Sequence, residues 1–132
     1  MPTFAGDATR FVDNRDGTMT DKGLGLTWQL GDSGKDLGKD LNWADAKAYA
    51  QGLRLGGHSD WRLPTIEELR SLVDKRRSDG RQIAAVFGDY SQWCWSATAN
   101  SGSRSVAWFV NFYDGNSSSF GFTTACRARC VR

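Results

Sequence analysis

The strongest folding signal in the chain is the stretch GGHSDWRLPTIEEL, residues 56–69. Pro64 and Thr65 predict a helix start, because Thr65 stands three residues before Glu68 in the spacing of a capping box. Apolar residues at helical spacing predict the side of this helix that faces the core: Ile66, Leu69, Leu72 and Val73. The polar run at residues 74–81 is expected to close the helix.

The same stretch contains distinctive side chains for which we expect structural roles. Trp61 is expected to anchor the core, and Arg62 or Asp60 to satisfy buried backbone groups of irregular loops. His58 has no candidate nucleophile pattern near it, and no serine or cysteine lies in a nucleophile elbow. We therefore predict no catalytic residue and do not expect an enzyme.

On the N-terminal side, residues 42–52 predict the first helix. Asn42 can cap its start, and Gly52 follows its last turn. Its apolar face is predicted to contain Trp43, Ala46, Ala50 and Leu53.

Before this helix, residues 10–21 predict a β-hairpin, because Asp-Gly is a strong tight-turn pair. A third strand is expected to end at Trp28. Residues 31–41 are polar and glycine-rich, so we expect a loop there.

The C-terminal third is predicted to be rich in strands. Candidates are residues 92–98, 105–115, 119–122 and 125–132, with a turn at 114–119. The second candidate alternates, so that one face has Val106, Trp108, Val110 and Phe112 and the other has Ala107, Phe109, Asn111 and Tyr113. A hairpin, two helices and an antiparallel meander predict an α+β fold with both helices on one side of a sheet.

Composition limits the class of protein. The length of 132 residues fits one domain, residues 1–132, and 39% hydrophobic residues are enough for a core. No apolar run is long enough to span a membrane, so no direct membrane insertion is expected. We see no secretion signal. A net charge of +2 is too balanced to indicate nucleic-acid binding.

The three cysteines give an ambiguous signal. Cys126 and Cys130 are four residues apart in a predicted strand, roughly 13 Å, which is too far for a disulfide. Cys94 could pair with either one, and an odd count leaves at least one thiol unpaired. Structural cysteines are favoured over a metal site, because no CxxC occurs and His58 is far away in sequence. We predict no metal and no cofactor.

Several motifs occur together in one order: RFVDNRDGTMTDKGLGLTWQ, then LNWADAKAYAQGLRLGGHSDWRLPTIEELRSLVD, then AWFVNFYDG and the terminal RCVR. In these motifs the chain resembles the bacterial domain family typified by the C-terminal domain of the Legionella collagen-like adhesin. The resemblance extends from Arg10 to Arg132.

The resemblance implies a compact C-type-lectin-like α+β fold, with two helices packed on antiparallel sheets and long irregular loops. It implies a binding module outside the cell, at a cell surface or on a phage particle, and a homo-oligomer such as a trimer. Some relatives resemble the variable proteins of diversity-generating retroelements. The family pattern has a cysteine where this chain has Ala50, so Cys130 is expected to lack its usual partner.

Residues 96–124 are predicted to form the ligand surface. Sixteen of these 29 residues are Ser, Thr, Asn or Gly, interleaved with aromatic residues, as in adaptable antibody loops. The ligand would be a protein or a glycan on another cell's surface. The candidate contact residues are Asn100, Ser101, Ser103, Arg104, Ser105, Tyr113, Asp114, Asn116, Ser117, Ser118, Ser119, Phe120, Phe122, Thr123 and Arg127.

Two interpretations of this surface stay open. One is a diversified recognition surface, and the other is a fixed, trimeric adhesin that binds anionic, sulfated glycans. Arg104, Arg127 and Arg129 could bind such glycans through bidentate hydrogen bonds. The arginines of the terminal strand are more often a solvated face. Phe120 and Phe122 share one strand face, so we expect both to be buried or both exposed.

Overall fold

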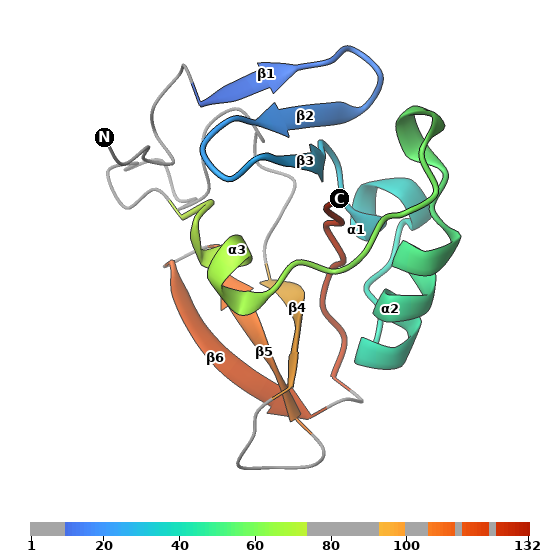
Figure 1. Cartoon of the computed structure of the whole chain (residues 1–132). Helices are drawn as coiled ribbons and strands as arrows, with labels where there is room; N and C mark the ends of the chain where they lie inside the picture. Colours follow the sequence, from blue (N-terminus) through green and yellow to red (C-terminus); the bar gives the residue numbers. More distant parts are fainter. Residues whose placement is uncertain (1–9, 74–92, 100–105, 113–114, 122–123) are drawn as a thin grey trace.

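The computed structural model describes residues 10–73, 93–99, 106–112, 115–121 and 124–132, and it contains two antiparallel sheets of three strands (Figure 1). The first sheet contains β1 (Phe11–Asp13), β2 (Thr18–Asp21) and β3 (Leu26–Gln29). The second contains β4 (Trp93–Ala99), β5 (Val106–Asn111) and β6 (Asn116–Gly121). The helical segments between them are α1 (Ser33–Leu37), α2 (Trp43–Gly52), the 3-10 turn η1 (Leu55–Gly57) and α3 (Ile66–Arg70). The α+β prediction is confirmed.

The N-terminal hairpin forms as predicted. β1 pairs with β2 through Val12 and Thr20, and β2 pairs with β3 through Met19 and Trp28. The turn between β1 and β2 needs a glycine, since Gly17 has φ +87° and a Cβ there would lie 3.0 Å from Leu55 Cδ1.

Both predicted helices begin where their capping residues stand. The Asn42 side chain accepts a hydrogen bond from the Asp45 N–H at the start of α2. Thr65 and Glu68 form the reciprocal capping box of α3. Gly52 is the last residue of α2, and Leu53 forms its C-cap.

The predicted loop at residues 31–41 is wrong in part, because Ser33–Leu37 form α1. This turn of helix is held from outside rather than by its own sequence: Ser33 Oγ accepts a hydrogen bond from the Ala128 N–H, and the Ser33 N–H donates to the Ala128 carbonyl. Three glycines within residues 31–38 concealed this helix in the sequence.

The strand β6 begins at Asn116, earlier in the chain than the predicted strand at residues 119–122. Asn111 pairs with Asn116 and Phe109 pairs with Ser118, so Asn116–Ser119 belong to β6 and not to a turn. Gly115, at φ +76°, allows the tight reversal, and its N–H donates to the Asn111 carbonyl at 2.8 Å.

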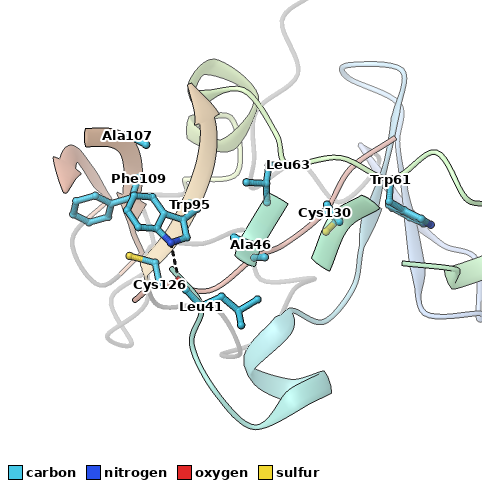
Figure 2. Packing of buried hydrophobic residues seen from close by; sticks show 11 residues of the cluster. Leu41, Ala46, Trp61, Leu63, Trp95, Ala107, Phe109, Cys126 and Cys130 are labelled. Atoms are coloured by element: carbon cyan, nitrogen blue, oxygen red, sulfur yellow. Dashed lines mark hydrogen bonds between the residues drawn. The ribbon is translucent and has the colours of Figure 1, made fainter. Parts of the chain in front are cut away.

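The two helices do not lie on one side of the second sheet, as the sequence had suggested. α3 buries Ile66 and Leu69 against the sheet face of Cys94 and Val110. α2 buries Ala46 and Ala50 in the cluster of the opposite face, with Trp95 and its neighbours (Figure 2). Both faces of β5 are therefore covered, which explains why its two alternating sets of residues are both mainly apolar.

Residues 125–132 were predicted to form a regular strand, but the C-terminal segment, residues 126–132, forms isolated bridges to several elements. It runs along β4, between the second sheet and α2, and ends near β3 (Figure 1). Its backbone carbonyls accept hydrogen bonds of 2.8–2.9 Å from N–H groups on β3, α1, β4 and the segments before α2 and α3: Thr27, Gln29, Ser33, Leu41, Arg62 and Trp95.

Arg129 lies inside the fold, so the expectation of a solvated face or a glycan contact is wrong for this residue. Its side chain is 0% exposed and donates to the backbone carbonyls of Gln29 and Leu30. In a regular strand Arg129 would lie on the face opposite Cys130 and Ala128. It is buried because the segment lies between two layers and neither of its sides faces water.

The three cysteines are buried free thiols in the structure. Burial raises the pKa of Cys126 and of Cys130 to about 12. Such thiols are neutral at ordinary pH and act as small apolar side chains.

A buried ion pair joins the first sheet to the end of α3. Arg10 Nε and Nη2 donate to the two carboxylate oxygens of Asp21 at 2.8 Å each, and Trp28 Nε1 donates to Asp21 Oδ2 at 2.9 Å. Burial alone would raise the pKa of Asp21, but the hydrogen bonds from Arg10 and Trp28 outweigh it and lower that pKa. Arg10 also donates to the Ser71 carbonyl, so the pair fixes where α3 ends.

Arg129→Met should lower the free energy of unfolding by about 3 kcal/mol or more, because two buried carbonyls lose their donor. Arg132→Met is the matched control on the same segment, since Arg132 pairs with the exposed Asp60 and should change stability little. Urea denaturation measures both. Equal losses for the two variants would contradict the structural role of Arg129.

Candidate functional site

The candidate surface is formed by β6 and the strands beside it. Of the predicted contact residues, Asn116, Ser117, Ser118, Ser119 and Phe120 lie on β6. The following lie outside the described residues: Asn100, Ser101, Ser103, Arg104, Ser105, Tyr113, Asp114, Phe122 and Thr123. In the described part of the chain β6 pairs with β5 alone, so it is the outer strand of the sheet order β4-β5-β6 (Figure 1).

The register divides the β6 side chains between two faces. Ser117 is opposite Val110 and Ser119 is opposite Trp108, while Ser118 is opposite Phe109. Residues directly opposite one another share a face. Ser117 and Ser119 therefore do not form one continuous surface with Asn116 and Ser118.

The first face, which we call the α3 face, contains Arg70, Trp108, Ser117 and Ser119. Arg70 Nε donates to Ser117 Oγ at 2.9 Å, and the guanidinium carbon lies 5.8 Å from the centre of the Trp108 ring. The indole is half-buried and Arg70 is exposed. This arrangement holds a cation above an aromatic ring, beside two hydroxyl groups.

The second face, which we call the Trp93 row, contains Trp93, Asn111, Asn116 and Ser118. Trp93 pairs with Asn111, and Asn111 pairs with Asn116, so these three side chains lie in line across the sheet. Trp93 is 38% exposed, and its ring centre lies 5.7 Å from that of the buried Phe109. The row combines an exposed aromatic ring with amide and hydroxyl groups, and Phe109 packs beside the ring on the same face of the sheet.

Arg127 is not part of either face. Its guanidinium lies 3.2 Å from Asp40 Oδ1 and 3.6 Å from Asp32 Oδ2. The side chain passes close to Gly34, where a Cβ would meet Arg127 Nε at 2.6 Å. Arg127 thus joins the C-terminal segment to α1, and its charge is balanced within the chain.

The residues of the SDWRLPT motif have structural contacts. Trp61 is 3% exposed and donates from Nε1 to the Leu55 carbonyl, as expected of a core anchor. Arg62 forms a bidentate pair with Glu68 at 2.8 and 2.9 Å, and this hydrogen bonding lowers the pKa of Glu68. Asp60 binds Arg132 rather than a backbone group.

A cavity lies away from both faces, near α1 and η1. It has a volume of about 440 Å³, and Leu30, Leu53 and Leu55 line it together with Asp36. Tyr49 donates to Asp36 Oδ2 at 2.9 Å beside it. None of the predicted contact residues lines this cavity. Within the described ranges no group of three or more His, Cys, Asp or Glu residues could hold a metal ion.

Sequence reasoning missed Arg70, Trp93 and Trp108 as surface residues. Trp108 was predicted on the face of its strand that also has Val106, Val110 and Phe112, and Trp93 was placed only within the strand candidate at residues 92–98. Only the register of Trp93 with Asn111 places Trp93 on this surface, and that register depends on how β4 pairs with β5. That pairing contains a register shift between Trp95 and Ala99, which no local pattern indicates.

Comparison with known families gives one finding. The model of the Lcl C-terminal domain family matches residues 17–132, which is most of the chain. This is an adhesin-type family and not an enzyme family. No curated protein matches the chain. Among the helices described, none has the length and apolar character needed to cross a membrane.

Substitutions on β6 should be tolerated where those on β5 are not. Ser118→Ala should change the free energy of unfolding by less than about 0.5 kcal/mol, because its side chain is exposed. Phe109→Ala, directly opposite, should cost about 3–5 kcal/mol by leaving a cavity. Chemical denaturation of both variants measures this difference, and a similar cost for the two would show that β6 belongs to the core.

Proposed function

The chain belongs to the Lcl C-terminal domain family, and on this premise we propose that it is a non-catalytic recognition domain that binds a protein or glycan outside the cell through β6 and the strands beside it. The adhesin-like character comes from the family. The ligand surface is our assignment. Localisation at a cell surface or on a phage particle is part of the same proposal.

The observation that carries the proposal is the contrast between β5 and β6. Ala107, Phe109 and Val110 of β5 are at most 4% exposed and join both core clusters. The β6 partners of Phe109 and Val110 are Ser118 and Ser117, which are exposed and half-buried, respectively. A rigid strand therefore supports a row of small hydrogen-bonding side chains, which is the arrangement that adaptable binding surfaces use.

The same contrast supports variation on this surface. Side chains of β6 that are exposed can change without altering the buried strand β5 beside them. A diversity-generating retroelement variable protein would concentrate its substitutions at such positions. Sequencing this gene across a natural population tests that idea, because the variants would be confined to adenine-containing codons within residues 96–129.

A second candidate function is a fixed, trimeric adhesin that binds anionic, sulfated glycans. The observation that favours it is Arg70 on the α3 face, held over Trp108 and beside Ser117. A guanidinium in this position can donate two parallel hydrogen bonds to a sulfate. Arg70→Ala should then abolish heparin binding, and light scattering should give the mass of a trimer.

Replacing both Asn116 and Ser118 by alanine should weaken adhesion of the domain to cultured epithelial cells by about tenfold, because two hydrogen-bonding groups at the centre of the surface are lost. Ser59→Ala, in an exposed loop far from β6, is the control. Flow cytometry with labelled domain measures binding.

Treating the cells with a protease or with glycosidases then separates a protein ligand from a glycan. Undiminished adhesion of the double variant would mean that β6 is not the contact surface.

A further inference from the structure

The Trp93 row has a composition that selects among ligands. Its members are one indole, two primary amides and one hydroxyl: Trp93, Asn111, Asn116 and Ser118. None of these side chains carries a charge. An anionic ligand therefore gains no ion pair from this row, in contrast to the α3 face with its Arg70.

The Trp93 ring packs against a buried neighbour on the same face of the sheet. Its centre lies 5.7 Å from that of Phe109 at an angle of 34°, and Phe109 is 4% exposed. Phe109 in turn belongs to the core cluster that contains Trp95 (Figure 2). An exposed indole that rests on a fixed ring loses little side-chain entropy when a ligand covers it.

A flat, electron-rich ring beside amides and a hydroxyl matches one ligand chemistry well. The face of an aromatic ring is negative, so it attracts the slightly positive C–H groups on the apolar face of a pyranose. The hydroxyl groups at the edge of that sugar need both donors and acceptors. Asparagine side chains supply both, and the serine hydroxyl does the same.

We infer that the Trp93 row is a subsite for a neutral, β-linked hexopyranoside, which stacks on Trp93 and hydrogen-bonds to Asn111, Asn116 and Ser118. β-Linked gluco- and galacto-configured sugars present a continuous patch of axial C–H groups of about the size of the indole. The inference rests on the proposed function and names the ligand class for one face of the same sheet.

The experiment is an NMR titration of the ¹⁵N-labelled domain with lactose and with cellobiose, following the indole N–H signal of Trp93. This signal is assigned by its absence in Trp93→Phe. We expect at least one sugar to shift the Trp93 signal, while the signals of the buried Trp28 and Trp61 stay in place. Heparin, the sulfated probe, should leave the Trp93 signal unchanged.

The variants separate stacking from general loss of structure. Trp93→Ala should weaken sugar binding at least tenfold, whereas Trp93→Phe keeps an aromatic face and should stay within about threefold. Asn116→Ala should weaken binding with the ring intact. Leu24→Ala is the control for removal of an exposed apolar side chain, since Leu24 is 44% exposed on the first sheet's turn.

The outcomes also distinguish this inference from the proposed function. One outcome is that neither sugar shifts the Trp93 indole signal while the double alanine variant at Asn116 and Ser118 still loses adhesion to cells. The sugar subsite is then wrong and the recognition surface stands. If the unmodified domain still adheres to glycosidase-treated cells and Trp93→Ala abolishes that adhesion, the face binds protein and the inference is overturned. If adhesion itself does not depend on β6, both fall together.

Discussion

The fold depends on the backbone hydrogen bonds of residues 126–132. The part of the chain that the structure describes contains two sheets of three strands each, and sheets of this size depend on packing partners for their stability. The C-terminal segment joins them because its N–H and carbonyl groups alternate between partners on both sides. Val131 exchanges two hydrogen bonds with Arg62, Arg132 exchanges two with Thr27, and Cys126 exchanges two with Leu41.

Toward the second sheet, the Arg127 N–H donates to the Trp93 carbonyl and the Trp95 N–H donates to the Arg127 carbonyl. One extended segment thus closes the structure between β3, α1, α2 and β4.

This arrangement explains where function can reside. The segment and α2 cover the β4 side of the second sheet, and α3 covers part of one face. In the part of the chain that the structure describes, β6 remains on the outside, and its polar side chains are exposed or half-buried where those of β5 are buried or half-buried. Buried polar groups elsewhere are satisfied by specific partners: Asp21 by Arg10 and Trp28, and Arg129 by two carbonyls. The buried charges of the described residues thus have structural partners, whereas β6 carries small polar side chains that are exposed or half-buried, and this is why we propose the recognition surface there.

The parts of the fold that were predictable are those with local causes. The capping residues Asn42 and Thr65 and the Asp-Gly turn act within a few residues, so the sequence indicates them directly. α1 and the buried Arg129 depend on residues about 95 to 100 positions away, through the hydrogen bonds of Ala128 to Ser33 and of Arg129 to Gln29. The candidate site shows the same division. The serines of β6 were predicted from composition, but their separation onto two faces and their association with Arg70 and Trp93 depend on strand register and on where α3 lies.

The central claim is that residues 126–132 hold the two sheets as one cooperative unit. Native-state hydrogen exchange measured by NMR tests it most directly, on the amides that donate into this segment from separate elements: Thr27, Leu41, Arg62 and Trp95. We expect all four amides to exchange only through global unfolding. Their exchange then reports one and the same free energy of opening, and added denaturant lowers this free energy by the same amount for each amide. Exchange of Thr27 and Arg62 through a separate, lower-energy opening while Trp95 stays protected would contradict it, because the sheets would then unfold independently.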